Sequence, residues 1–294
     1  MQNPSYVFPN TSGIKQRGSL VERWNYAATL GCEYIEVPAD FIKNKTEVEK
    51  TGLELCTFLT NDAIKALYQR DITFPSQLKY ILHTEPSLPR TDGYGFPSKA
   101  PLKWYDSEWV SRFIDMTLAI SKYLGLPASV IEIHPGDKRN SALNIINSAQ
   151  TLLSKYRTEF SIEVTILLEN RTGQFIASGR DIADFWAVAS DQCPDWRSNL
   201  GIILDIQQLY TVTKADFINE LNLIPNDCIK GLHIHSKHRL PVTEDEIPWE
   251  YVFRKIAGID NRLIINPEIH HKNKVNDAIM FCNRMLAAVD PTGQ

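Results

Sequence analysis

The sequence predicts an α/β protein, a (β/α)8 TIM barrel that spans residues 1–294 as a single domain. Eight short runs of β-branched and aliphatic residues alternate with longer stretches of helical periodicity, which is the pattern of such a barrel. The length of 294 residues also fits one barrel. An open doubly wound sheet is the alternative, but the sequence has neither of the glycine-rich phosphate-binding patterns GxGxxG and GxxxxGKS/T.

The predicted elements follow one another along the whole chain. The strand candidates are rich in Val, Ile and Leu, as parallel strands buried on both faces usually are. They cover residues 5–8, 33–37, 79–83, 129–134, 164–169, 200–205, 229–235 and 263–269. The helix candidates cover residues 20–30, 109–124, 142–156, 182–189, 215–223, 249–257 and 275–288. Residues 46–69 fit either two short helices or a helix and a small extra element. Residues 84–106, rich in Pro and Gly, form the longest predicted loop.

Composition and charge exclude several classes of protein. Hydrophobic residues make up 43% of the chain, which excludes a mainly disordered protein. The 31 basic and 35 acidic residues give a formal net charge of −4, which excludes nucleic-acid binding by bulk charge. The five cysteines contain no CxxC pair, which favours a reducing compartment. The sequence has no apolar run of roughly 20 residues and no secretory signal pattern at its start. We therefore expect a cytoplasmic protein that does not enter membranes.

Residues of the types that bind metals stand at the ends of six consecutive predicted strands. In chain order they are His83, His134, Glu169, Asp205, His233 and Glu268. The carboxyl ends of barrel strands form the active-site face, and imidazole and carboxylate groups bind zinc, manganese or iron. One such histidine alone is more often a hydrogen-bonded core residue, and one such carboxylate is often a helix cap. Six in succession favour a shared metal centre.

Other polar residues close to these strand ends are weaker candidates. Glu36 is either near the site or a satisfied polar residue of the core. Glu132 and His235 each lie two residues from a candidate histidine, so each shares its side of the strand and can support it. His238 can bind a metal or the substrate, and His270 also lies near the predicted site. Several basic residues suit an anionic or phosphate-bearing substrate, although each alone is more simply a solvated rim residue. They are Lys138, Arg139, Arg171, Lys237 and Arg239.

Two short motifs resemble those of a known family. HPGD at residues 134–137 resembles the HPG motif, and LENRTGQ at residues 168–174 resembles the LEN-x-x-GQ motif, of the endonuclease IV branch (AP endonuclease family 2). This branch is part of the xylose isomerase-like barrel superfamily, whose fold pattern the chain resembles from about residue 20 to 290. The resemblance implies a first metal ion held by His83, His134 and Glu169. It implies a second held by Asp205, His233 and Glu268, with Glu169 bridging the two.

The sequence departs from that branch at three places. Gln208 stands where the branch has a histidine, three residues after the aspartate of the sixth strand. The segment after the seventh strand lacks an Asp-x-His pair, which leaves His238, Glu244 or Asp245 to complete a third metal site. The segment HTEPSLP lacks the aromatic residue that the branch inserts into DNA.

The resemblance and the candidate residues imply a metal-dependent hydrolase with a centre of two ions, expected to be Zn²⁺, with Mn²⁺ or Fe²⁺ as alternatives. The substrate would be a phosphodiester, either a small molecule or a nucleic acid such as abasic DNA. Glu169 and Glu268 would be catalytic, the first as bridging ligand and the second as ligand and proton acceptor. The residues expected to contact the substrate are Arg171, Lys237, Arg239, Gln208, His235 and His238.

Two other functions remain open from the sequence. The first is a sugar isomerase or epimerase of the same superfamily with one metal ion. Glu169 and Glu268 would then move protons on opposite faces of the substrate carbon, and His83 and His134 would bind substrate hydroxyl groups. The second is a binding protein that keeps the barrel without catalysis.

Overall fold

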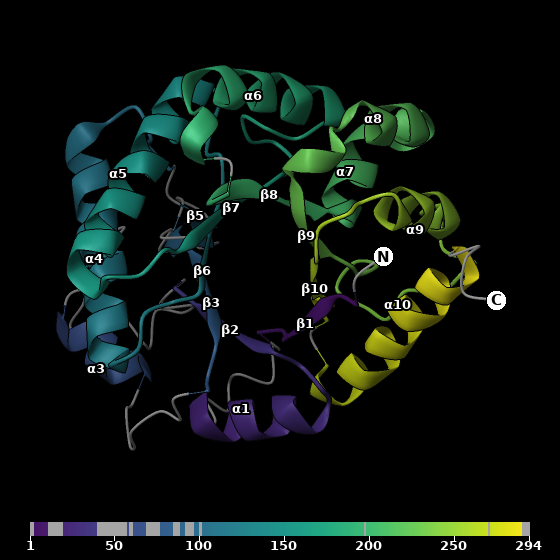
Figure 1. Cartoon of the computed structure of the whole chain (residues 1–294), viewed down its shortest axis with the longest axis horizontal. Helices are drawn as coiled ribbons and strands as arrows, with labels where there is room; N and C mark the ends of the chain where they lie inside the picture. Colours follow the sequence, from purple (N-terminus) through teal and green to yellow (C-terminus); the bar gives the residue numbers. More distant parts are fainter. Residues whose placement is uncertain are drawn as a thin grey trace.

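Eight parallel strands close into a barrel in the order β1-β10-β9-β8-β7-β6-β3-β2 (Figure 1). The computed structural model describes residues 3–10, 20–39, 58, 61–68, 77–84, 89–91, 97–99, 102–196, 198–269 and 271–289. The barrel strands are β1 (Ser5–Phe8), β2 (Tyr34–Pro38), β3 (Tyr80–Thr84), β6 (Val130–Ile133), β7 (Thr165–Glu169), β8 (Leu200–Asp205), β9 (Ile229–His233) and β10 (Ile264–Asn266). The predicted (β/α)8 barrel is therefore confirmed.

Helices surround the barrel and cover its outer face (Figure 1). Those described are α1 (Leu20–Thr29), α3 (Asn61–Tyr68), α4 (Ser107–Leu124), α5 (Ala142–Phe160), α6 (Gly179–Gln192), α7 (Ile206–Thr213), α8 (Phe217–Leu223), α9 (Trp249–Ala257) and α10 (Val275–Val289). Local signals set several of their ends. Asp106 caps the start of α4, and Gly125 ends it in the left-handed conformation. At α6, Ser178 and Asp181 form a capping box.

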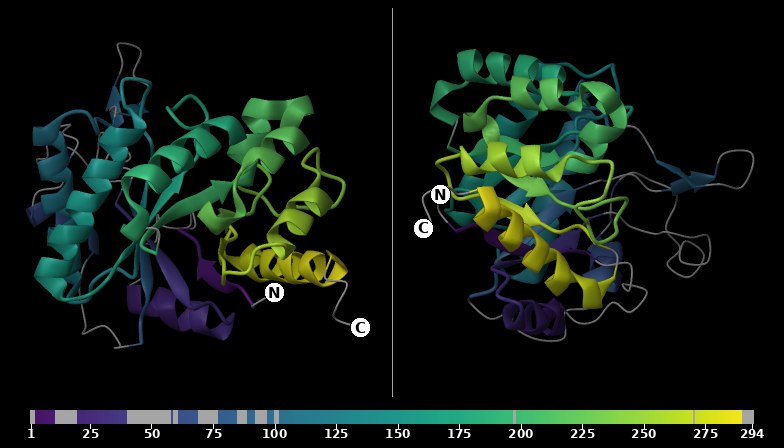
Figure 2. Two further views of the ribbon diagram at one scale, coloured as in Figure 1. Left: turned by 45° about the horizontal axis from the view of Figure 1, so that its top comes forward. Right: turned by 90° about the vertical axis from the view of Figure 1, so that its right-hand side faces the viewer.

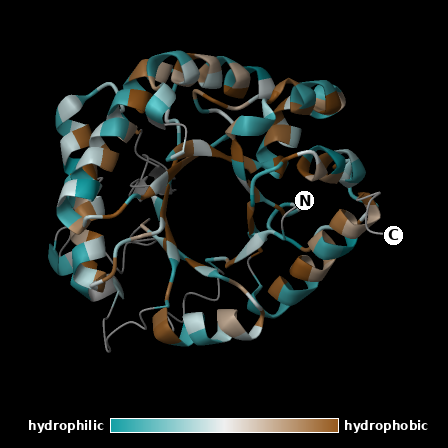
Figure 3. Cartoon of the chain, viewed as in Figure 1, coloured by the Kyte–Doolittle hydropathy of each residue, from teal (hydrophilic) through white to brown (hydrophobic). Residues whose placement is uncertain are grey.

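The apolar core has two parts separated by the strands. The larger part packs between the strands and the helices, and the hydropathy colours of Figure 3 show apolar positions along the strands and within the helix ring. The smaller part fills the barrel interior and consists of Val7, Ile81, Val130, Leu167 and Ile203. The interior is thus a packed layer rather than a pore.

Three predicted strands end earlier than expected, β6 by one residue, and one helix was not predicted. β9 ends at His233 and β10 at Asn266, so His235 and Glu268 lie in the loops that follow. α7 begins directly after β8 because a carboxylate oxygen of Asp205 accepts the backbone N–H of Gln208 and caps the helix. Asp205 therefore does have the capping role that a lone carboxylate at a strand end often has.

The longest predicted loop contains a small hairpin of its own. β4 (Pro89–Thr91) and β5 (Pro97–Lys99) pair antiparallel, and the right-hand view of Figure 2 shows them standing well away from the barrel. Residues 85–88, 92–96 and 100–101 of this loop lie outside the described residues, as do residues 46–57 of the segment with two readings. Within the described residues, no helix combines the length and the apolar character that crossing a membrane requires.

Candidate metal centre

A polar layer lies directly above the apolar layer inside the barrel. Because side chains alternate along a strand, the residue two positions after each inward-facing apolar residue also faces inward. Ile81 is followed in this way by His83, Leu167 by Glu169, and Ile203 by Asp205. The same alternation applies to Glu36, Glu132, His233 and Asn266 on the other strands. Strand geometry therefore brings histidines and carboxylates from across the barrel into one place.

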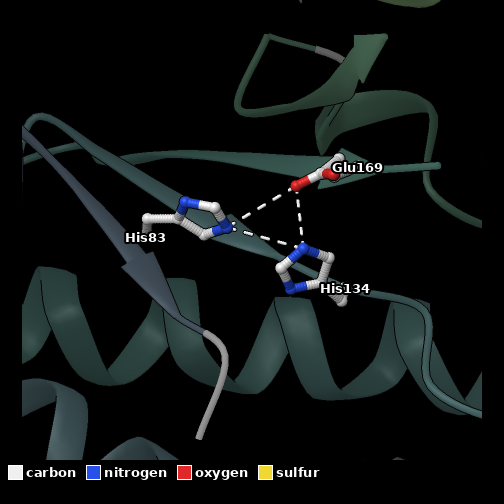
Figure 4. Close-up of side chains that lie close together, drawn as sticks. All are labelled: His83, His134 and Glu169. Atoms are coloured by element: carbon white, nitrogen blue, oxygen red, sulfur yellow. Dashed lines mark hydrogen bonds and ion pairs between the residues drawn. The ribbon is translucent and has the colours of Figure 1, made fainter. Parts of the chain in front are cut away.

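The first group of ligand-type atoms comes from the ends of three neighbouring strands. Nε2 of His134 lies 2.8 Å from Oε2 of Glu169 and 3.4 Å from Nε2 of His83. Nε2 of His83 lies 3.5 Å from the same carboxylate oxygen. Figure 4 shows the three side chains pointing toward one another. The first predicted set of ligands is thus brought together.

The second group lies beside the first. One atom each of Asp205, His233 and Glu268 falls within 4.8 Å of the others. Nδ1 of His233 lies 3.5 Å from Oε2 of Glu268 and 3.9 Å from Oε2 of Glu169. Asp205 and Asn266 both pair with His233 in register on the neighbouring strands. Glu169 therefore adjoins both groups.

Two of the histidines each lie against a buried carboxylate on the side away from the ligand groups. Oε1 of Glu36 lies 2.7 Å from Nδ1 of His83, which leaves Nε2 of that ring facing Glu169. Oε1 of Glu132 lies 3.3 Å from Nε2 of His233, which leaves Nδ1 facing Glu268. Such carboxylate–histidine pairs fix the tautomer and orientation of metal-binding rings. Glu132 thus has the supporting place expected for it, although the histidine that it supports best is His233 rather than His134. Both readings of Glu36 hold, because it is a buried carboxylate with its hydrogen bonds satisfied and one of its partners is His83.

The charges in this layer control one another's protonation. Burial alone would raise the pKa of Glu169, but His134, His83 and His233 hold it well below its ordinary value. Burial alone would lower the pKa of His233, but Glu132, Glu268 and Glu169 raise it well above its ordinary value. Protons on histidines therefore balance the buried carboxylates, and divalent ions can take the place of these protons.

The donor set fits divalent metal ions. Several buried atoms lie close to partners of opposite charge without forming a hydrogen bond, among them both oxygens of Glu132, Oε2 of Glu169 and Nδ1 of His233. Unpaired buried polar atoms are costly, and a metal ion would satisfy those that face the two groups. Nitrogen and carboxylate oxygen are the donors that zinc, manganese and iron accept.

The two sequence motifs form loops that brace each other. Oε1 of Gln174 accepts the backbone N–H of Gly136 at 2.8 Å, and the N–H of Phe175 donates to the Gly136 carbonyl at 2.7 Å. Asn170 bonds both to the backbone N–H and to the carbonyl of Asp205. The motifs therefore fix the loops that present His134, Glu169 and Asp205.

A tight turn at residues 236–239 carries several of the predicted substrate residues. Ser236 and Arg239 exchange two backbone hydrogen bonds, and Lys237 and His238 between them have φ values of 52° and 56°. Residues other than glycine seldom adopt this left-handed conformation, and it often marks functional sites. The exposed side chains of Lys237 and Arg239 accordingly project from a strained turn beside the site.

His235 lies against the carboxylates of the second group. The backbone N–H of His238 donates to Nδ1 of His235 at 3.0 Å, which places the proton of the neutral ring on Nε2. Nε2 lies 3.0 Å from Oε2 of Glu268 and 3.5 Å from Oδ2 of Asp205. His235 therefore turns its protonated nitrogen toward the two carboxylates, although that nitrogen forms no hydrogen bond with either.

The candidates for a third metal site are spread over different surroundings. Nδ1 of His238 lies 3.7 Å from Oε2 of Glu268. Oδ2 of Asp245 is engaged in its own loop, where it accepts the N–H of Val242 and the indole N–H of Trp249. Glu244 lines a surface pocket against α10. Of the three candidates, only His238 lies in a group of ligand-type residues, in which one atom each of His235, His238 and Glu268 falls within 4.8 Å of the others.

The remaining substrate candidates differ in how closely they approach the site. Nη1 of Arg171 lies 2.8 Å from Nε2 of His134. Gln208 uses its side-chain oxygen to accept the N–H of Thr172, so it joins the loops after β7 and β8. The guanidinium of Arg139 pairs with Asp137 and lies over Tyr105. Lys138 is exposed, and His270 lies outside the described residues.

Sequence reasoning gave no place at the site to Asn266, whose Nδ2 lies 3.1 Å from Oε2 of Glu36. The signal was available, because Asn266 occupies the inward position of the eighth barrel strand, two residues after Ile264. An amide, however, is not a residue type that a search for metal ligands selects.

Comparison with known proteins agrees with this architecture. The sequence matches the family described as xylose isomerase-like TIM barrel over residues 24–285. None of the curated proteins matches it. Similar solved structures include an AP endonuclease of family 2 from Brucella melitensis, with a TM-score of 0.57 and 14% identity over 97% of this chain and 99% of that one. A D-tagatose 3-epimerase-like protein has a TM-score of 0.57 and 15% identity, over 97% of this chain and 98% of that one. An L-ribulose 3-epimerase has a TM-score of 0.55 and 13% identity, over 98% and 96%. These structural likenesses show the fold alone.

Proposed function

Because the chain belongs to the xylose isomerase-like TIM barrel family, we propose that it is a metal-dependent enzyme that hydrolyses a phosphodiester through a two-metal centre. The position of Glu169 carries this proposal. One of its carboxylate oxygens lies 2.8 Å from Nε2 of His134 and 3.9 Å from Nδ1 of His233, between two groups of ligand-type side chains. A carboxylate in that position is suited to bridge two ions.

The two groups assign the ligands of each ion. His83, His134 and Glu169 would hold the first, and Asp205, His233, Glu268 and Glu169 would hold the second. Zn²⁺ is the ion that we expect, with Mn²⁺ or Fe²⁺ as alternatives. When bound, a pair of such ions activates a water molecule and stabilises negative charge on the phosphate oxygens.

The protein's own side chains supply the rest of the chemistry. Glu36 hydrogen-bonds to Nδ1 of His83, and Glu132 faces Nε2 of His233, so the other nitrogen of each ring would present its lone pair to the site once the ring is neutral. Contacts with His233 and His235 overcome burial and keep the pKa of Glu268 well below its ordinary value, so this carboxylate is ionised and can accept a proton. We assign Arg171, whose guanidinium contacts the first group, to binding phosphate oxygens of the substrate. Lys237 and Arg239 add positive charge from the turn.

A sugar isomerase or epimerase with one metal ion is the second candidate. The observation that favours it is the contact of the Arg171 guanidinium with Nε2 of His134, because a cation already lies against one ligand of the first group. The second group and Glu169 would then hold a single ion. Glu169 and Glu268 would exchange protons with the substrate carbon from opposite sides.

Hydrolysis assays with added metal test the proposal. The substrates are bis(p-nitrophenyl) phosphate and an oligonucleotide with one abasic site, each with Zn²⁺ or Mn²⁺. We expect hydrolysis that stops with a chelator, returns with metal, and is lost in Glu169→Gln but retained in the surface control Glu159→Gln. Absence of hydrolysis of both substrates, together with exchange of solvent deuterium into a ketose, would establish the second candidate instead.

A further inference from the structure

The side chain of Arg171 reaches into the first group of ligands. Its Nη1 lies 2.8 Å from Nε2 of His134. The same ring nitrogen faces Oε2 of Glu169 at 2.8 Å and Nε2 of His83 at 3.4 Å. The guanidinium therefore contacts the very atom of His134 that a metal ion in this group would bind.

Arg171 and a metal ion cannot contact Nε2 of His134 at the same time. A guanidinium has only donors and stays protonated in proteins, so Nε2 of His134 must accept with its lone pair. A metal ion needs the same lone pair, and an imidazole nitrogen has only one. Nδ1 of His233, the corresponding atom of the second group, has no hydrogen-bond partner.

We infer that Arg171 and a divalent ion compete for Nε2 of His134, so that the His83–His134–Glu169 group binds its ion more weakly than the Asp205–His233–Glu268 group. The inference rests on the two-metal centre of the proposed function. It also gives an order of loading, in which the second group fills first and the first group fills only when Arg171 withdraws.

The loop around Arg171 allows this exchange through side-chain motion alone. The Arg171 N–H donates to the carbonyl of Ile176, and its carbonyl accepts the N–H of Gln174, so the backbone is held at both ends. The side chain is half-buried, whereas that of His134 is fully buried. Of the two, Arg171 is the one placed to withdraw toward solvent, where its guanidinium can bind an oxygen of an anionic substrate.

Metal titration of Arg171→Met tests the competition, since methionine retains much of the length and removes the charge and the donors. The measurement is calorimetric titration of the metal-free protein with Mn²⁺ alone. Arg254→Met, which removes an exposed basic residue from the last turn of α9, is the matched control. In the unchanged protein we expect one tight and one weak site. In Arg171→Met the weak site should tighten by about tenfold or more, the factor expected for a hydrogen bond that involves a charged group, and the tight site should not change.

Two further variants secure the assignment. His134→Ala in the Arg171→Met background should remove the tightened site. If thermal unfolding shows that Arg171→Met is not folded, Arg171→Gln takes its place. A weak site that is unchanged or weaker without Arg171, or a single site in every variant, would overturn the inference. If metal binding tightens in Arg171→Met but the protein hydrolyses no phosphodiester, the inference is supported and the proposed function fails.

Discussion

Buried carboxylates determine which nitrogen of each histidine faces the centre of the barrel. Glu36 accepts three contacts, from Nδ1 of His83, the backbone N–H of Asn10 and Nδ2 of Asn266. The contact with His83 keeps the pKa of Glu36 low against the effect of burial, which favours a carboxylate that accepts from all three partners. When the His83 ring gives up its second proton to bind a metal ion, its lone pair is thereby directed to the metal centre.

Glu36→Gln should disturb this arrangement without changing the size of the side chain. One end of the amide must still accept from Asn10 and Asn266, so its NH₂ would face Nδ1 of His83 and drive the ring proton to Nε2. We expect metal affinity at the first group to fall by about 10–100-fold, as for other residues that orient metal ligands. Calorimetric titration measures this, with Glu159→Gln as control. Unchanged affinity would show that Glu36 does not set the tautomer.

At the residue scale, the sequence predicted ligands better than it predicted their partners. The six metal-binding candidates share one signal, a suitable side chain at the end of a strand, and all six lie in the two predicted groups. The partner of His83 lies 47 positions away and that of Asn266 lies 230 positions away. Pairings across the barrel depend on strand register and closure, which local patterns do not contain.

The loop after β6 contains Gly136, where both the backbone conformation and the lack of space favour glycine. Gly136 has a φ of 71°, and a Cβ there would lie 2.6 Å from the carbonyl oxygen of Leu102 and close to Asn140. Gly173, in the facing loop, has a φ of 77° but no atom within 4 Å of such a Cβ. Comparing Gly136 with Gly173 therefore separates the cost of backbone strain from the cost of steric conflict.

Alanine at these two positions should destabilise the protein to different extents. Strain alone predicts a loss of about 1 kcal/mol for Gly173→Ala, and overlap with backbone raises the loss to about 2–4 kcal/mol for Gly136→Ala. Denaturant unfolding of both variants gives the comparison. Equal losses would mean that the loop of residues 134–137 moves freely enough to absorb the side chain.

At the element scale, the composition of each segment was enough to find the strands but not all of their ends. Single apolar residues recur after His233 and Asn266, at Ile234 and Ile269, so the predicted strands were too long, whereas pairing with the neighbouring strands stops at His233 and Asn266. α7 was missed because Asp205 is at once the last residue of β8 and the cap of the helix. Nothing in the local sequence separates those two roles.

Across the whole molecule, the polar layer couples metal binding to protons. Burial lowers the pKa of His83, but Glu132, Glu169 and Glu36 outweigh it and raise the pKa well above its ordinary value. A histidine that is protonated in the metal-free protein must release its proton when it binds a metal ion, so affinity should rise with pH. Titration in buffers of different ionisation enthalpy, between about pH 6 and 8, should show proton release. Affinity that does not depend on pH would contradict the protonated state.

The whole fold was predictable because its main signal is repeated eight times. Each alternation of strand and helix supports the same barrel, so errors at single boundaries did not change the result. The chemistry cannot be predicted in the same way, since the solved structures with a similar fold include both an AP endonuclease and a sugar epimerase. A cytoplasmic location stays a prediction.

The number of metal ions per chain tests the central claim of a shared two-metal centre most directly. Protein dialysed against excess Zn²⁺ or Mn²⁺, then analysed for bound metal, should hold two ions. His134→Ala should hold one, and the control His271→Ala, which changes an exposed histidine outside the ligand groups, should hold two. One ion in the unchanged protein, unaffected by His134→Ala, would contradict the two-metal centre and leave the second group as the only metal site.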